Sequence, residues 1–156
     1  MLLKDLVLGI DHIGVCVDDM DAAAGLWTSL LGNAVAHREC VEAQKTEAVF
    51  FDFSGDLAPD GATVELVAPM AGNVGLLKFL EKRGNGLHHL AFAVSDIRAA
   101  LARLAEAGVA LIDREPRQGA RGHLVAFLHP RAMNGILVEL VEHGDAAHVA
   151  TKEKSS

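Results

Sequence analysis

The sequence contains few cysteines, and the two that it has show no functional spacing. They are Cys16 and Cys40, in a chain of 156 residues. Two cysteines are too few for a disulfide framework, and they lack the paired spacing of a cysteine metal site. We therefore expect both to be small apolar residues within strands, in a protein of a reducing compartment.

The sequence also lacks a long apolar run and an excess of positive charge. No segment approaches the roughly 20 apolar residues that span a bilayer, and no basic segment with a following apolar run opens the chain. Lys and Arg number 14 against 21 Asp and Glu, which gives a net charge of −7. Nucleic acids and anionic membranes bind basic surfaces, so we expect no nucleic-acid partner, no membrane association and a cytoplasmic location.

The sequence contains enough apolar residues to form the core of one domain. Its hydrophobic fraction is 51%, and a chain of this length buries a substantial core. We expect a single domain over residues 1–144, followed by a polar tail over residues 145–156.

Within that domain the sequence repeats itself. The segment DHIGVCVDD at 11–19 corresponds to HHLAFAVSD at 88–96, and the strand-like VELV recurs at 64–67 and 138–141. The two repeats cover residues 6–68 and 87–143, and a joining segment over residues 69–86 contains a short amphipathic helix. A duplicated fold therefore brings two copies of each matched position into one domain.

Each repeat has the hydrophobic pattern of a β-α-β-β-β unit. The expected fold class is α+β, with two paired units forming a curved mixed sheet around a metal-binding cleft. We expect a turn over 56–61 and helices over 20–31, 74–82 and 96–107. The expected strands cover 6–17, 35–38, 48–53, 62–67, 87–94, 109–113, 124–128 and 136–142.

The duplication places four potential metal ligands at matched positions. His12 and His89 begin the repeats, and Glu65 and Glu139 end them. Two imidazoles and two carboxylates suit a divalent cation. Each Glu interrupts an apolar strand, where a buried unpaired carboxylate would be unfavourable. The alternative is that each Glu faces solvent, and a single strand His is more often structural than a ligand.

Strand alternation indicates what surrounds the two imidazoles. His12 shares a face with Gly14, and His89 shares a face with Ala91 and Ala93, so small residues line the side that carries each ligand. We expect the opposite face of the second repeat to pack under its helix, with His88 on that core side.

Beyond these patterns, several ordered motifs match a known family. The segments DHIGVCV, ELVAP, FLEKRGNGLHHLAF, EPRQGARG, FLHP and GILVELVEH resemble the methylmalonyl-CoA epimerases of the vicinal oxygen chelate superfamily, which also includes glyoxalase I and extradiol dioxygenases. The resemblance implies a divalent metal held by His12, Glu65, His89 and Glu139. It suggests Co²⁺, although Zn²⁺, Ni²⁺ and Mn²⁺ suit the same ligands. It also implies a homodimer, and the ligands could meet within one chain or across two.

The resemblance implies epimerisation of methylmalonyl-CoA by removal and return of the C2 proton through a metal-stabilised enolate. Such a reaction needs a base on each face of the planar intermediate. Glu139 is one candidate base. The resemblance suggests Glu47 as the second, with Gln44 as a polar substrate contact, although a solvated charge at a strand end is an equal alternative for Glu47.

An acyl-CoA substrate also needs cationic groups for its phosphates. Arg114, Arg117 and Arg121 occupy one glycine-containing stretch and are candidate substrate contacts, although an ordinary solvated basic loop would have the same composition.

Three other functions are compatible with parts of this pattern. Lactoylglutathione lyase (glyoxalase I) would use the same four ligands. An extradiol dioxygenase would use two His and one Glu on iron, and Glu65 disfavours it by supplying a second carboxylate. A resistance-type protein that binds a small molecule would not need the full metal set.

Overall fold

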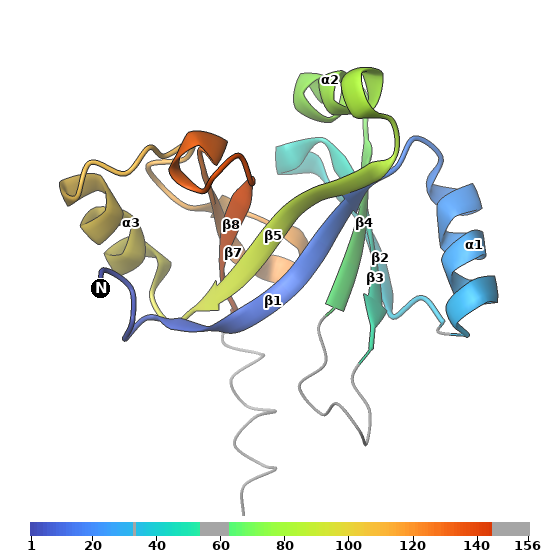
Figure 1. The fold of residues 1–156 in the computed structure, drawn as a ribbon. Helices are drawn as coiled ribbons and strands as arrows, with labels where there is room; N and C mark the ends of the chain where they lie inside the picture. Colours follow the sequence, from blue (N-terminus) through green and yellow to red (C-terminus); the bar gives the residue numbers. More distant parts are fainter. Residues whose placement is uncertain (33, 54–62, 145–156) are drawn as a thin grey trace, which may run out of the picture. The chain divides into compact units, whose positions relative to one another are not determined.

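The computed structural model describes residues 1–32, 34–53 and 63–144, which divide between two compact units. One unit is Asp11–Leu90, and the other combines Met1–Ile10 with Ala91–Ser156. Strands β1 (Val7–Cys16) and β5 (Gly86–Val94) each run from one unit into the other (Figure 1). The expected turn over 56–61 and the expected tail over 145–156 lie outside the described residues.

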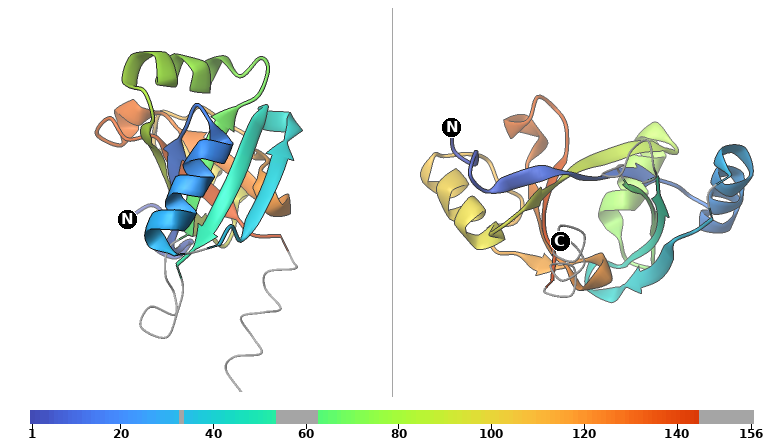
Figure 2. Two further views of the ribbon diagram at one scale, coloured as in Figure 1. Left: turned by 90° about the vertical axis from the view of Figure 1, so that its right-hand side faces the viewer. Right: turned by 90° about the horizontal axis from the view of Figure 1, so that it is seen from below.

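The Asp11–Leu90 unit is a sheet with one long helix packed on it. The strand order is β2-β3-β4-β1-β5; β1 pairs with β4 in parallel, and β3 pairs with β2 and β4 in antiparallel fashion. Helix α1 lies against β3 and β4 (Figure 2). Its elements after β1 are α1 (Met20–Leu31), β2 (His37–Val41), η1 (Glu42–Gln44), β3 (Thr46–Asp52), β4 (Thr63–Pro69) and α2 (Val74–Arg83).

The register of this sheet separates a polar site from an apolar core. Glu65 of β4 pairs with Gly14 of β1 and with Phe50 of β3, so these positions share one face with His12. The alternate residues face α1 and form its core, which includes Val17, Met20, Ala24, Val49, Phe51, Leu66 and Ala68. The strands therefore present their ligand candidates on the face opposite α1.

The second unit repeats this arrangement around helix α3. Its sheet contains the order β5-β8-β7-β6, with β6–β7 and β7–β8 antiparallel. Ile97, Leu101 and Leu104 of α3 pack on Val138 and Leu140 of β8. Its elements after β5 are α3 (Ile97–Glu106), β6 (Arg117–Gln118), η2 (Ala120–Gly122), β7 (Leu124–Leu128), η3 (Pro130–Ala132) and β8 (Val138–Glu142).

Equivalent aspartates begin the two equivalent helices. The Asp19 carboxylate accepts a hydrogen bond from Ala22 N at 2.9 Å, and the Asp96 carboxylate accepts one from Ala99 N at 2.8 Å. Both satisfy backbone N–H groups that a helix start leaves without partners. At the end of α1, Gly32 adopts φ 74° and donates its N–H to Thr28 O. None of the helices in the described ranges is long and apolar enough to cross a membrane.

The structure confirms the predicted α+β class and corrects one element. The strand expected over 109–113 does not form as a regular strand. Leu111 makes an isolated bridge to Leu128, and Ile112 N and Asp113 N both donate to Phe127 O. The Asp113 carboxylate accepts the Phe127 N–H at 2.9 Å. This N–H therefore does not bond to a backbone carbonyl of the expected strand, and regular pairing is interrupted. Pro116, which has no N–H, follows, and pairing resumes at β6. Strand β2 also lies a few residues later than expected, at His37–Val41.

Candidate metal centre

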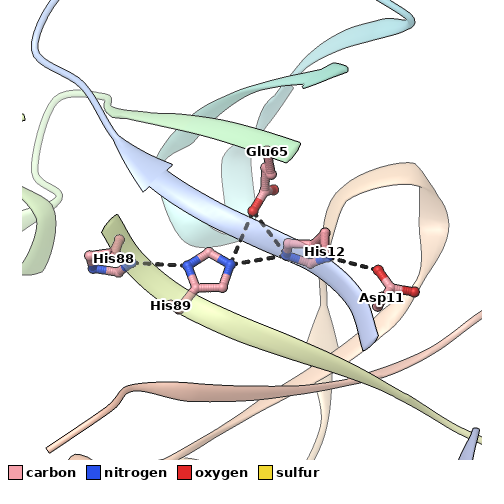
Figure 3. A network of polar contacts seen from close by, with 5 residues as sticks. All are labelled: Asp11, His12, Glu65, His88 and His89. Carbon is pink, nitrogen blue, oxygen red and sulfur yellow. Dashed lines mark hydrogen bonds and ion pairs between the residues drawn. The ribbon is translucent and has the colours of Figure 1, made fainter. Parts of the chain in front are cut away.

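Three of the four expected ligands meet within the Asp11–Leu90 unit. The Nε2 atoms of His12 and His89 are 3.0 Å apart, and each lies 3.2 Å from Oε2 of Glu65 (Figure 3). The imidazoles come from β1 and β5, and the carboxylate comes from β4 between them in sequence. All three residues are buried, so the solvent-facing alternative for Glu65 does not hold.

These three donor atoms form a triangle of the size that a metal ion requires. Ligands about 2.1 Å from an ion lie about 3.0 Å apart when they are at right angles and about 3.4 Å apart in a tetrahedron. The observed separations of 3.0, 3.2 and 3.2 Å fall within this range. Two imidazole nitrogens and one carboxylate oxygen are also suitable donors for a divalent transition metal. The residues therefore fit a divalent metal ion.

Each imidazole is held from its other ring nitrogen. Nδ1 of His12 lies 2.7 Å from the carboxylate of Asp11, and Nδ1 of His89 lies 3.0 Å from Nδ1 of His88 (Figure 3). A carboxylate only accepts hydrogen bonds, so it selects the His12 tautomer with the proton on Nδ1. That tautomer leaves the Nε2 lone pair for a ligand.

A glycine and a phenylalanine lie beside the two imidazoles. Gly14 leaves the space that the His89 ring fills, because a Cβ at this position would overlap that ring. The Phe50 ring stands edge-on to His12, with centroids 6.3 Å apart. Gly14 therefore leaves room on the strand face for the ring of a candidate ligand.

The charge state of Glu65 follows from the same contacts. When both imidazoles are protonated, burial raises the pKa of this carboxyl, but hydrogen bonds from His12 and His89, together with their positive charge, outweigh burial and lower it to about 2. Glu65 is therefore ionised at neutral pH, as a metal ligand must be.

The fourth expected ligand, Glu139, belongs to the other unit. It is a buried residue of β8, opposite Phe127 of β7. Alternation places it with Val141, away from the Val138 and Leu140 side chains that pack under α3. Glu65 likewise lies on the strand face opposite α1, so the two carboxylates occupy equivalent positions in their repeats.

Glu47, the expected second base, lies on the other face of its strand. In the register of β3 and β4, Phe50 pairs with Glu65 and faces the site, and Glu47 pairs with Ala68. Glu47 is three residues before Phe50, so strand alternation directs its side chain to the opposite face, towards α1. There its carboxylate binds Arg38 at 2.6 Å, and Arg38 also binds Asp21 of α1 at 2.7 Å. This placement gives no support to Glu47 as a base, and that role stays a prediction.

The expected substrate contacts are divided between the two units. Gln44 ends η1, and its backbone carbonyl accepts hydrogen bonds from Thr46 and from Asn73 at the start of α2. In the other unit, Arg114 and Arg121 are exposed. Arg117 binds the Asp113 carboxylate at 3.1 Å and lies over the Phe127 ring.

Two residues of the centre were not predicted from the sequence. Asp11 was not singled out, although an acid directly before a candidate ligand is a signal that could have identified it. His88 was expected on the core side under the helix of its repeat, yet its ring lies edge-on to Phe79 of α2 with centroids 4.9 Å apart. Only the tertiary contact shows that it reaches His89.

A family model matches most of the chain. Residues 11–127 match the model of the glyoxalase/bleomycin resistance protein/dioxygenase superfamily. The chain belongs to this superfamily. The match covers most of the first repeat and the greater part of the second, and the α+β fold described above is the glyoxalase-like fold expected of it.

Individual relatives within the superfamily include epimerases. The chain is 41% identical over 133 residues to the uncharacterized protein YqjC of Bacillus subtilis, covering 85% of this chain and 91% of the relative. It is 35% identical over 133 residues to the ethylmalonyl-CoA/methylmalonyl-CoA epimerase of Cereibacter sphaeroides, covering 84% of this chain and 95% of the relative.

Solved structures give the same comparison. A crystal structure of methylmalonyl-CoA epimerase from Mycobacterium tuberculosis matches with a TM-score of 0.83 and 34% identity, covering 96% of this chain and 97% of that one. A methylmalonyl-CoA epimerase in complex with methylmalonyl-CoA and NH4⁺ matches with a TM-score of 0.82 and 32% identity, covering 89% of this chain and 96% of that one.

Proposed function

We propose that this protein is an isomerase that interconverts the C2 epimers of methylmalonyl-CoA. The observation that carries the proposal is the triangle of His12, His89 and Glu65 in a chain with epimerase relatives. The substrate's C2–H lies between a thioester carbonyl and a carboxylate, so inversion requires its proton to be removed and returned on the opposite side.

In this proposal His12, Glu65 and His89 hold the cation, and Glu139 is the fourth ligand. The support for Glu139 is its burial and its equivalence to Glu65 on the strand that closes each repeat. The bound cation supplies Lewis acidity, which stabilises negative charge on the substrate's thioester oxygen. Co²⁺ is our first candidate, and the ligand set also accommodates Zn²⁺, Ni²⁺ or Mn²⁺.

The carboxylates of the chain move the proton. A Glu139 oxygen takes the C2 proton from one side of the substrate, and a second base returns a proton from the other. Glu139 is 4% exposed, so bulk water has little access to this carboxylate.

Glu47 remains our candidate for the second base, and its position makes the role testable. Glu47 takes this role only after its side chain leaves Arg38 and reaches the opposite face of the sheet, because β3 directs it towards α1. If it returns the proton, Glu47→Gln will exchange the C2 proton of one epimer with solvent without inverting it. Unchanged inversion in Glu47→Gln would remove Glu47 from the mechanism and leave it as the partner of Arg38.

The substrate's CoA portion requires cations and hydrogen-bond donors, for which we propose Arg114, Arg117 and Arg121, with Gln44 as a further polar contact. Arg114 and Arg121 are exposed and accessible to phosphates. Arg117 is oriented by Asp113 and Phe127. Replacement of Arg114 and Arg121 by Ala should therefore raise KM for the CoA ester more than it lowers kcat.

The proposal includes a homodimer in the cytoplasm. Leu8 and Ile10, which are two residues apart on the same face of β1, are 64% and 56% exposed, and this exposed apolar pair suits contact with a second copy. Both cysteines are free, as expected in a reducing compartment. Light scattering of the wild type and of Leu8→Asp tests the dimer, which the variant should weaken.

Proton exchange at C2 of methylmalonyl-CoA in deuterium oxide tests the activity. We expect rapid exchange with Co²⁺-loaded protein, little exchange with metal-stripped protein, and a large loss in Glu139→Ala. Absence of exchange in folded, Co²⁺-loaded protein would rule out the epimerase. The glutathione hemithioacetal is the control substrate, since a lactoylglutathione lyase with the same ligands would convert it instead.

A further inference from the structure

We propose that His88 is a positioning residue that fixes the imidazole of His89 for metal binding. This inference rests on the proposed metal site and adds to it a residue that does not touch the cation. Figure 3 shows His88, His89 and His12 in a row, with Glu65 beside them.

The contacts of His89 define its orientation from both ring nitrogens. Nδ1 lies 3.0 Å from Nδ1 of His88, while Nε2 lies 3.0 Å from His12 and 3.2 Å from Glu65. An imidazole is rigid, so a hydrogen bond at Nδ1 sets the direction of Nε2. When Nδ1 of His89 donates to Nδ1 of His88, the Nε2 lone pair of His89 is directed at the ion's position.

The two repeats hold Nδ1 of their candidate ligand histidine with different groups. In the first, the Asp11 carboxylate holds Nδ1 of His12 at 2.7 Å. In the second, the imidazole of His88 takes that place, because the residue before His89 is His88. A group at this position commonly changes metal affinity by about 10- to 100-fold when it is removed.

His88 is itself fixed by packing from α2. Its ring stands edge-on to Phe79, with centroids 4.9 Å apart and planes at 76°. Helix α2 begins at an Asn73 cap, which accepts a hydrogen bond from Leu76 N. The His89 ring occupies the space left by Gly14 on its other side. His88 therefore holds the His89 ring on one side, while the strand face at Gly14 holds it on the other. Phe79 packs on His88 and does not hydrogen-bond to His89.

Co²⁺ binding to the metal-stripped full chain tests this role, by calorimetry and by the visible d–d absorption of the bound ion. His88→Phe keeps an aromatic ring but removes Nδ1, and we expect about tenfold weaker binding or more, with a changed spectrum. His88→Asn supplies an amide oxygen near the position of Nδ1, and should stay within about threefold of the wild type.

His129→Phe is the matched control, because it makes the same substitution at an exposed histidine whose Nδ1 accepts the Arg131 N–H; we expect Co²⁺ affinity within about threefold of the wild type. Wild-type affinity and spectrum in folded His88→Phe would overturn the role of His88. So would equal losses in His88→Asn and His88→Phe when both unfold at the wild-type temperature. Failure of the wild-type protein to bind Co²⁺ would instead overturn the metal site, and the role of His88 with it.

Discussion

At the scale of single residues, the absence of a side chain at Gly14 is as important as the ligands themselves. Gly14 lies on β1 two residues after His12 and opposite Glu65 on β4. The His89 ring fills the space that a Cβ would occupy there. A strand glycine normally weakens a sheet, so this one has a packing function.

Gly14→Ala should therefore displace His89 and weaken Co²⁺ binding by at least about tenfold. Gly25→Ala is the control, since a Cβ on Gly25 meets nothing within 4 Å and lies in helix α1. It should keep the affinity and stabilise the protein by up to about 1 kcal/mol. Calorimetric titration with Co²⁺ measures the first effect, and urea unfolding measures the second. Equal affinities in the two variants would contradict the close approach.

The two cysteines should differ sharply in reactivity. Burial, with a smaller contribution from the Asp18 charge, raises the pKa of the Cys16 thiol to about 11. Because the thiolate is the reactive form, Cys16 should stay protonated and unreactive at pH 8. Cys40 is exposed. A colorimetric thiol reagent should modify one thiol per native chain and two after denaturation, and Cys40→Ser should remove the fast reaction. Two fast thiols in the native wild type would show that Cys16 is accessible.

At the scale of elements, the repeat extends to the helix caps. Asp19 and Asp96 make the same hydrogen bond to the third residue after them. We expect Asp19→Ala and Asp96→Ala each to lower the free energy of unfolding by about 1 kcal/mol, while Asn at either position retains most of the cap. Urea unfolding of the metal-stripped protein measures these changes. A loss as large in the Asn variants would show that charge, rather than the cap bond, stabilises the helices.

The elements also show where sequence patterns succeed and fail. The helices over 20–31, 74–83 and 97–106 were predicted closely, because their apolar spacing and caps are local properties. The strand over 109–113 was predicted wrongly, because the Asp113 side chain takes the Phe127 N–H that a strand neighbour would have used. Apolar residues alone therefore do not determine which backbone groups pair.

At the scale of the whole molecule, metal binding should be coupled to folding. The native state brings His12, Glu65 and His89 together from three strands, whereas the unfolded chain has no such site. Co²⁺ at 100 times its Kd should therefore raise the free energy of unfolding by about 2.7 kcal/mol. Thermal unfolding with and without Co²⁺ measures this difference. His12→Ala should lose the increase, and an equal increase in that variant would place the binding elsewhere.

The sequence by itself determined the duplication, the α+β class and the metal-ligand candidates, since these follow from local hydrophobic periods and from residues at matched places. Tertiary structure decided which groups meet. It joined His12, Glu65 and His89 across three strands, placed Asp11 and His88 against the imidazoles, and turned Glu47 towards Arg38. The physical reason is that strand register and close packing set side-chain directions, and both depend on contacts between segments far apart in the chain.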